Sequence, residues 1–197
     1  LTEYRIPYFI DEKKSLKAHP LSQFLLDCFR VVRERYSPAS VQAFTQNVFF
    51  GESDEYRNYL LKFANYRGGA KRAIKTGETV AAAFDISYLE NCRNKVLKAT
   101  ENIKARGHGR DYCRAVEKIR EDFNTDELLK TLSDNVEDVA QKGYLSQIEK
   151  ALDALLAEAE LLTGNKELTA AEFEAILKDG LDATEISLIP LKADAVF

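Results

Sequence analysis

The chain has no methionine and no tryptophan, and only two histidines and three cysteines among its 197 residues. Cys28, Cys92 and Cys113 are odd in number and show no Cys-x-x-Cys spacing, so neither a disulfide framework nor a metal knuckle is indicated. No apolar run approaches the roughly 20 residues that cross a bilayer. The first residues also lack the layout of a signal peptide. We therefore expect a cytoplasmic protein with reduced thiols and no membrane partner.

Sequence signatures of catalysis are also missing. No GxxxxGK[ST] phosphate loop, GxSxG elbow or HExxH motif occurs, and no spacing of Asp and Glu suggests a metal cluster. His19 precedes Pro20 and is interpreted as a helix-entry residue, whereas His108 lies between two glycines and is expected in an exposed turn. We therefore predict no catalytic residue, no metal site and no cofactor within this chain.

The missing methionines include the first residue, and both ends of the chain are apolar and strand-like. We interpret the ends as cuts through a fold and the chain as a piece of a longer protein. Modified methionines that are left out of the sequence would also explain why it contains no methionine.

Charge is distributed unevenly along the chain. Residues 57–120 contain 15 Lys and Arg against 6 Asp and Glu, a net of +9, whereas residues 121–197 contain 6 against 18, a net of −12. This asymmetry has two readings: a basic surface that meets an anionic partner, or two halves that pair with each other.

Apolar residues recur mostly at the spacing of three and four that is typical of amphipathic helices. Predicted helices begin at Pro20, at Pro38 after an N-cap at Ser37, and after capping boxes at Ser87/Glu90 and Thr169/Glu172. A long helical region is predicted over 126–162 with a joint at Gly143, and Gly51 and Gly180 are expected to end helices. The expected buried faces include Leu21, Phe24, Leu25, Cys28, Val32, Val41, Phe44, Val48, Tyr56, Tyr59, Leu60, Phe63, Leu89, Cys92, Val96, Ala99, Ile103, Tyr112, Val116, Ile119, Phe123, Leu128, Leu132, Val136, Val139, Leu145, Ile148, Leu152, Leu155, Ala159 and Leu162.

Two strands are predicted, over Tyr4–Ile10 and Glu185–Ile189, on either side of about seven or eight helices. Two strands alone make at best a marginal sheet, so both are expected to belong to a larger one. The fold class is therefore mainly α: a bundle-like helical insertion domain flanked by short strands, with the chain termini close together.

Two basic clusters are candidate DNA-binding sites. In the first, Gly68 and Gly69 precede what is interpreted as a basic helical start, where backbone N–H groups and Lys or Arg side chains would meet phosphates and an aromatic ring would stack on a base. The second cluster surrounds the Gly-His-Gly turn. The alternative for each is a flexible turn with solvated cations. The candidate residues are Tyr66, Arg67, Lys71, Arg72 and Lys75 in the first cluster, and Arg106, Arg110 and Arg114 in the second.

Three segments resemble a known family. Residues 4–26 contain Ile-Pro-Tyr-Phe and later His-Pro-Leu. This stretch resembles one in the B component (AddB/RexB type) of bacterial ATP-dependent helicase–nucleases. Residues 180–190 and 194–197 resemble the segment in which that family's chain re-enters its second RecA-like domain. Residues 56–61 and 66–71 lie where the family has an Asn-Tyr and an Arg-Gly stretch, although Arg57 stands where the family often has Glu.

The resemblance implies a domain organisation and a role. Residues 1–36 would be the end of a RecA-like 2A segment and a lead-in helix, residues 37–182 a helical 2B-like insertion domain, and residues 183–197 the return strand into the RecA-like domain. The parent would be an ATP-dependent helicase and exonuclease acting in double-strand break repair by homologous recombination. Its ATP, Mg²⁺ and iron–sulfur sites would lie outside this chain.

Two binding functions therefore remain open. In the first, the chain is a non-catalytic part that contacts single-stranded or forked DNA through its basic clusters. In the second, it is a docking module whose acidic half holds the A component of the complex, a nuclease/helicase. A stand-alone enzyme is a third reading, for which the sequence offers no nucleophile or metal cluster.

Overall fold

The computed structural model describes residues 13–63, 72–136 and 139–187, and in this part the chain is mainly helical, as predicted. The helices are α1 (Pro20–Arg33), α2 (Pro38–Gln46), α3 (Asp54–Phe63), α4 (Glu78–Ala81), α5 (Ile86–Thr100), α6 (Gly109–Asp122), α7 (Thr125–Asp134), α8 (Val139–Thr163) and α9 (Ala170–Ala183), with a 3-10 turn over Leu16–Ala18. The strands are β1 (Lys13–Ser15), β2 (Arg106–His108), β3 (Glu167–Thr169) and β4 (Glu185–Ser187).

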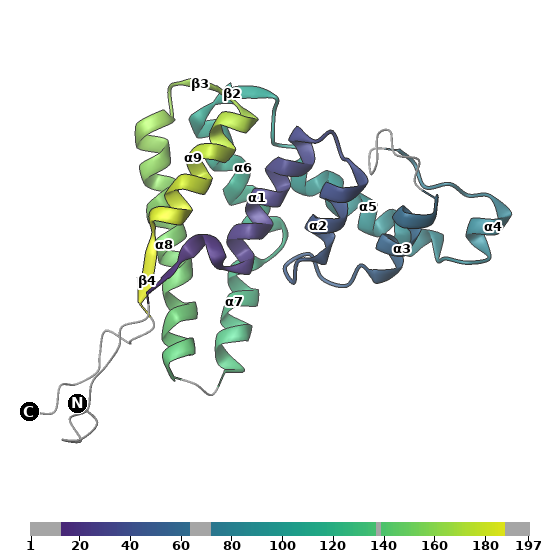
Figure 1. Cartoon of the computed structure of the whole chain (residues 1–197), viewed down its shortest axis with the longest axis horizontal. Coiled ribbons are helices and arrows are strands. Elements are labelled where there is room, and N and C mark those ends of the chain that lie inside the picture. Colours follow the sequence, from purple (N-terminus) through teal and green to yellow (C-terminus); the bar gives the residue numbers. More distant parts are fainter. Residues whose placement is uncertain (1–12, 64–71, 137–138, 188–197) are drawn as a thin grey trace, which may run out of the picture.

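The helices form an elongated body with α1 at its centre (Figure 1). Helices α6, α7, α8 and α9 pack together on one side of α1, and α2, α3, α4 and α5 extend to the other side. Helix α1 itself packs against α9, α2 and α5. One helix therefore joins the two groups.

Aromatic side chains on α1 explain how it joins them. Phe24 stacks on Phe44 of α2 at 4.9 Å between ring centroids and meets Phe123 edge-on at 5.0 Å. Five residues along α1, Phe29 lies 5.6 Å from Phe173 of α9. Phe24, Phe29, Phe44 and Phe173 are fully buried. Burial of each such side chain stabilises the fold by about 1.5–3 kcal/mol.

A short antiparallel pair closes the described ends of the chain. Strand β1 pairs with β4, and Lys13 lies opposite Ser187. This pairing brings residues 13 and 187 together and confirms the strand expected over Glu185–Ile189 as far as residue 187. The chain termini, which are predicted to lie close together, are outside the described residues. The strand expected over Tyr4–Ile10 lies outside the described residues. The larger sheet and the domain boundaries after residues 36 and 182 stay predictions.

Several predicted helix starts are confirmed. His19 caps α1 through Nδ1, which accepts a hydrogen bond from the backbone N–H of Leu21 at 3.1 Å. Ser37 caps α2 by accepting from the N–H of Ser40 at 3.2 Å. Thr169 forms the expected capping box with Glu172 at the start of α9. The residue after each of the first two caps is proline, which suits the first position of a helix.

The capping box predicted at Ser87 is wrong. Helix α5 begins at Ile86, and its N-cap is Asp85, whose carboxylate accepts from the N–H groups of Ser87 and Tyr88 at 2.9 and 3.2 Å. Glu90 instead accepts from the backbone N–H of Ile74 at 3.2 Å. Asp and Ser are comparable N-caps, so local sequence could not separate them.

The glycines expected to interrupt helices do not all do so. Helix α8 runs through Gly143, and the joint between α7 and α8 falls earlier, between Asp134 and Val139. Helix α9 runs through Gly180, where a Cβ would lie 2.4 Å from Leu155 Cδ1, so this glycine permits close packing of α8 and α9. Helix α2 ends at Gln46, and Gly51, at φ +86°, belongs to the turn beyond it.

Three residues expected on buried faces are exposed. Val48 lies after the end of α2, and its exposed fraction is 53%. Leu132 and Leu162 are 36% and 59% exposed near the ends of α7 and α8. Helical spacing predicts an apolar face along the whole helix, but it does not show where a neighbouring element stops covering that face. At these three positions, little of the described part of the chain covers the side chain.

Candidate nucleic-acid interface

The first basic cluster lies only partly within the described residues. Tyr66, Arg67 and Lys71 are outside them, whereas Arg72 and Lys75 are exposed. The expected helical start is wrong for the described residues, because 72–77 have no regular secondary structure and α4 begins only at Glu78. The side chains of Arg72 and Lys75 remain accessible at the surface.

Backbone contacts explain why this segment is not helical. The N–H of Ile74 donates to Glu90 of α5, and the N–H of Lys75 donates to the hydroxyl of Tyr59 on α3 at 3.0 Å. The carbonyl of Arg72 accepts from Nε of Arg93 at 2.7 Å. The amides of residues 74 and 75 already have partners, so at these two positions a phosphate contact would rest on side-chain charge.

The second cluster is built on β2 and the first turns of α6. Arg106 lies in β2, which pairs antiparallel with β3, and Arg110 and Arg114 follow on α6. All three side chains are exposed. Because Arg110 and Arg114 are four residues apart, they share one face of the helix. The cluster lies at the α6–α9 side of the body, away from residues 72–77, which adjoin α3 and α5 (Figure 1). Arg72 and Lys75, the described members of the first cluster, therefore do not share a site with it.

A close approach of two turns positions the start of α6. The N–H groups of Gly109 and Arg110 donate to the carbonyls of Lys166 and Gly164 at 3.0 and 3.4 Å. A Cβ on Gly109 would lie 2.3 Å from Thr163 Oγ1, so only glycine fits without a shift. The turn after α8 thereby sets where the arginines of α6 emerge.

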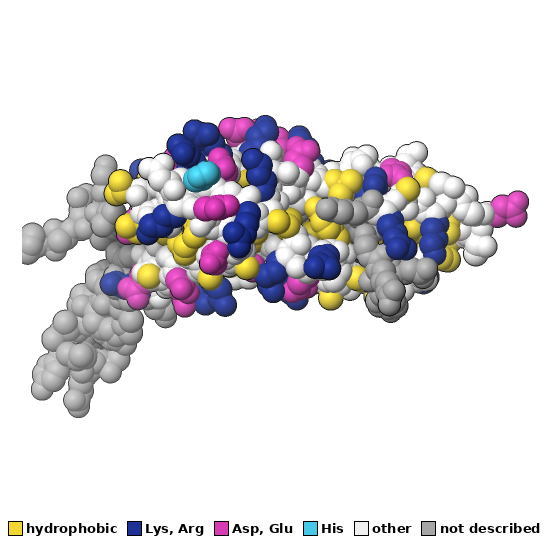
Figure 2. Space-filling model, turned by 90° about the horizontal axis from the view of Figure 1, so that it is seen from above, with side chains coloured by type: hydrophobic (Ala, Val, Ile, Leu, Met, Phe, Trp, Pro, Cys, Tyr) yellow, Lys and Arg dark blue, Asp and Glu magenta, His cyan; other side chains and the backbone are white. Residues whose placement is uncertain are grey.

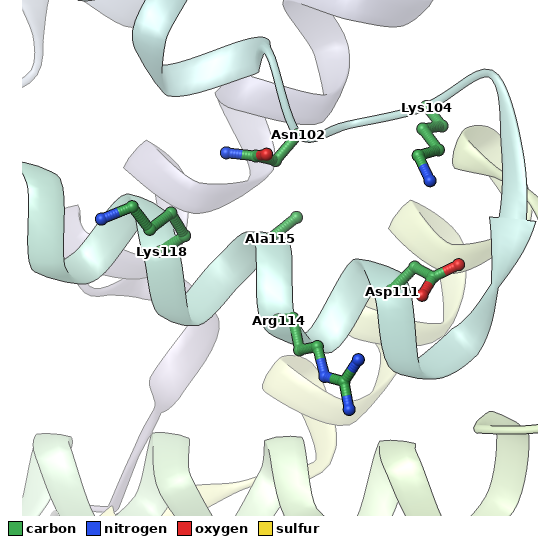
Figure 3. Close-up of a pocket in the computed structure, with 6 residues that line it drawn as sticks. All are labelled: Asn102, Lys104, Asp111, Arg114, Ala115 and Lys118. Atoms are coloured by element: carbon green, nitrogen blue, oxygen red, sulfur yellow. The ribbon is translucent and has the colours of Figure 1, made fainter.

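Beside this cluster lies a hollow of about 310 Å³ between α6 and the segment that joins α5 to β2 (Figure 3). The hydroxyl of Tyr112 lies 3.1 Å from the carbonyl of Lys104 and holds the joining segment over α6. The residues that line the hollow are Asn102, Lys104, Asp111, Arg114, Ala115 and Lys118.

The cations surround this hollow without converging on one point. In Figure 3, Lys104 reaches from the joining segment towards α6, whereas Arg114 points away from that segment and Lys118 lies further along the helix. Three cations and one carboxylate give the lining a formal net charge of +2. This arrangement suits an extended anion better than a single tightly held phosphate.

Carboxylates partly neutralise the cations of the hollow. Asp111 accepts from the backbone N–H of His108 at 3.3 Å, and Lys118 contacts Glu121 at 3.3 Å and Asp122 at 3.0 Å. Hydrogen bonds to these two carboxylates raise the pKa of Lys118. Among the described residues, Lys104 and Arg114 have no ion-pair partner. Within the lining, these two side chains are the ones free to meet an anion.

The basic and acidic halves of the chain pair with each other in part, whereas the meeting of a basic surface with an anionic partner stays a prediction. Lys98 and Lys118 pair with Asp122, and Arg120 pairs with Asp126 and Asp153 at 3.0 and 2.6 Å, so the basic and acidic halves do contact each other. Arg106, Arg110 and Arg114, by contrast, have no ion-pair partner among the described residues. Figure 2 shows Lys and Arg interleaved with Asp and Glu on the face seen from above.

His19 and the three cysteines are buried, whereas His108 is exposed. Burial lowers the pKa of His19 to about 4 and raises the pKa of Cys113 to about 11. Burial also raises the pKa of Cys28 and Cys92. Within the described residues, no group of three or more His, Cys, Asp or Glu side chains is arranged to hold a metal ion.

Asn102, Lys104 and Lys118 were missed by the sequence analysis. The spacing of Arg110, Arg114 and Lys118, each four residues after the last, is a basic helical stripe that the sequence does contain. Lys104 had no such signal, because its place over α6 depends on the fold.

In the described part of the chain no helix combines the length and apolar character required to span a bilayer.

Fold and site together define a mainly helical domain with a basic surface hollow. No family model matches the chain. It is 24% identical to the B component of the ATP-dependent helicase/deoxyribonuclease of Anoxybacillus flavithermus, over 98% of this chain and 19% of that protein. The proteins of the same name from Clostridioides difficile and Geobacillus kaustophilus are 22% and 26% identical over 98% of the chain, covering 18% and 19% of their own lengths.

These similarities confirm the resemblance found in the sequence and are consistent with a fragment of this family of B components. The chain spans less than a fifth of the length of the curated relatives it matches.

Proposed function

We propose that this chain is a non-catalytic, DNA-contacting helical part of the B component of a bacterial ATP-dependent helicase–nuclease. Its parent would act in the cytoplasm, in double-strand break repair by homologous recombination. The observation that carries the proposal is the exposed pair Arg110 and Arg114 beside the basic hollow, in a chain similar over 98% of its length to proteins named as helicase/deoxyribonuclease components. ATP, Mg²⁺ and an iron–sulfur cluster would be bound by other parts of the parent.

The test is binding of the full chain to labelled single-stranded and forked DNA, measured by fluorescence anisotropy from about 50 to 200 mM salt. Lys and Arg that neutralise phosphates release counterions, and the logarithm of the affinity falls with the logarithm of the salt concentration by about 0.7 for each phosphate on a single strand. Replacement of Arg110 and Arg114 by Ala should therefore reduce the slope by about 1.4.

Two further variants sharpen this test. Arg72→Ala with Lys75→Ala reports on the other cluster, and Lys150→Ala with Lys178→Ala removes the same charge from exposed sites on α8 and α9. An unchanged slope in the α6 variant, or an equal loss in the α8/α9 control, would mean that the α6 arginines make no specific contact. Absence of binding at 50 mM salt would overturn the proposal for this chain.

A second function, docking of the A component of the complex, is favoured by a separate observation. An acidic hollow of about 250 Å³ on α6, α7 and α8 is lined by five carboxylates around Arg120. A basic partner surface would complement it. Charge reversal at Glu117, Glu121 and Glu149 should abolish co-purification with the A component, whereas Arg110→Ala with Arg114→Ala should leave it intact. Retention of the A component by the charge-reversed protein would exclude this hollow as the contact.

A further inference from the structure

A second basic hollow lies next to the first and contains none of the residues predicted to bind DNA. Its volume is about 390 Å³, and it opens between the turn after α2, the C-terminal half of α5 and the turn between α6 and α7. Its lining residues are Val48, Phe49, Phe50, Gly51, Lys95, Lys98, Asp122, Phe123, Asn124 and Leu128.

The interior of this hollow is apolar and its rim is cationic. Phe123 and Leu128 are half-buried in its wall, and Val48 at its edge is 53% exposed. Lys95 holds its ammonium group 5.8 Å from the centroid of the buried Phe50 ring. Lys98, one helical turn further along α5, is exposed. Such a hollow suits a flat apolar group that is joined to an anion.

An ion-pair bridge connects the two hollows. Asp122, whose side chain is only 8% exposed, accepts from Lys98 of α5 at 3.1 Å and from Lys118 of α6 at 3.0 Å. Lys98 lines the second hollow and Lys118 the first. Both lysine side chains are about half exposed while they pair with this carboxylate. The carboxylate therefore sets two cations between the hollows.

Together the two hollows make one basic strip along the facing sides of α5 and α6. It contains the cations Lys95, Lys98, Lys104, Arg114 and Lys118. The carboxylates that line the hollows are Asp111 and Asp122, and Glu121 also contacts Lys118, so the strip has a formal net charge of +2. A linear polyanion could contact both hollows at once, whereas a single small anion could not.

We propose that this strip is a track for single-stranded DNA, with phosphates along the α5 and α6 cations and one base inserted into the apolar hollow beside Phe123. The inference rests on the proposed DNA-contacting function and names the form of DNA and its path. A single strand offers both features, since its bases are free to enter an apolar site while its backbone carries regular negative charge. In a duplex the bases are stacked and paired, so the apolar hollow would stay unused.

The experiment measures anisotropy of the full chain with a labelled oligo-dT strand and with the same strand carrying one abasic site near its centre. The abasic strand keeps its phosphates and loses one base. Stacking of a base on an aromatic side chain is worth about 1–3 kcal/mol, so we expect a loss of roughly tenfold in affinity for a site-length strand. A duplex of the same length should bind more weakly than the intact strand.

Variants assign this effect to the hollow. Lys95→Gln with Lys98→Gln removes two charges and leaves an amide to hydrogen-bond with Asp122, and it should lower both affinity and salt slope. Val48→Glu places a negative charge at the exposed edge of the hollow, and it should make the intact and abasic strands bind equally. Lys150→Ala with Lys178→Ala is the matched control. Thermal unfolding of each variant checks that it is folded.

The outcomes separate this inference from the function it rests on. If the chain binds no DNA, both fail. If Arg110→Ala with Arg114→Ala weakens binding while the Lys95/Lys98 and Val48 variants do not, the proposed function stands and the track is overturned. Equal affinity for duplex and single strand, or displacement of the oligonucleotide by polyglutamate at equal charge concentration, would overturn single-stranded DNA as the occupant.

Discussion

Replacement of Gly109 by Ala should destabilise the protein and displace the basic start of α6. A Cβ at this position would lie 2.3 Å from Thr163 Oγ1, 2.4 Å from the Thr163 carbonyl oxygen and 2.6 Å from its carbonyl carbon. Two of these atoms are backbone, so rotation of the Thr163 side chain cannot relieve the clash. Overpacking of this kind typically costs about 1–3 kcal/mol.

A smaller opposing effect must be subtracted. Ala is favoured over Gly in a helix by up to about 1 kcal/mol, and less at the first helical position, which Gly109 occupies. We therefore expect a net loss of about 1–2 kcal/mol, or a decrease in Tm of roughly 2–8 °C for a chain of this size. Urea denaturation followed by circular dichroism would measure it.

Gly107→Ala is the matched control, two residues earlier in the same turn. Its Cβ would first meet Asp111 Oδ2 at 3.4 Å, which is ordinary contact. We expect a change within about 0.5 kcal/mol, or a slight gain from the reduced freedom of the unfolded chain. Equal stability of the Gly107→Ala and Gly109→Ala variants would refute the reasoning, because only one of them has a clash to relieve.

Three further predictions concern the core, the pH dependence and the ion-pair bridge. Phe24→Ala should cost about 3–5 kcal/mol, because its ring is fully buried between α1 and α2, whereas Leu161→Ala, at a residue 86% exposed, should change the urea midpoint little. Burial lowers the pKa of His19 to about 4 in the folded protein, so between pH 6.5 and 4 the unfolded chain binds a proton that the folded chain does not. The free energy of unfolding should therefore fall by up to about 3 kcal/mol as the pH decreases over this range. His19→Asn keeps an N-cap and should remove that part of the pH dependence in urea titrations at several pH values. Burial alone would raise the pKa of Asp122, but hydrogen bonds from Lys118 and Lys98 outweigh this effect and lower the pKa. The ionised carboxylate therefore stabilises the protein above its unfolded pKa near 4, and this stabilisation is lost as the pH falls through the folded pKa. Asp122→Asn should accordingly destabilise the protein at pH 7, and near pH 3 the stability of the variant should be closer to that of the unsubstituted protein.

The helices could be predicted from sequence because their signals are local. Apolar spacing identified the buried side of α1 through Phe24 and Leu25, and the caps at Ser37 and Thr169 mark helix starts in the structure. The glycines were less informative, since Gly143 and Gly180 lie inside helices. At Gly180 the reason is a contact with Leu155 from α8, which lies 25 residues earlier and leaves no local trace.

The candidate site was predicted only in part, because some of its residues come together only through contacts between distant parts of the sequence. Arg110 and Arg114 are neighbours on one helix, so their cluster could be found from spacing. Lys104 joins it only because Tyr112 holds the preceding segment against α6. Lys98 was not predicted for a different reason. Glu90 and Glu101 give α5 the mixed charge of a solvated helix, and only the packing of α5 beside α6 brings Lys98 and Lys118 to the same carboxylate.

Ion pairing also decides where the basic charge remains available. In the α6–α8 region, carboxylates of the acidic half pair with the cations near the C-terminal end of α6. Asp122 forms an ion pair with Lys118, and Asp153 forms one with Arg120. Arg110 and Arg114, nearer the N-terminal end, have no ion-pair partner among the described residues. A net charge of +9 over residues 57–120 therefore overstates the surface that an anion would meet. In the described part of the chain, Lys95 and Lys104 carry charge without an ion-pair partner along the strip, and Arg106, Arg110 and Arg114 carry it at the start of α6. Loss of charge at these positions should change the salt dependence of DNA binding.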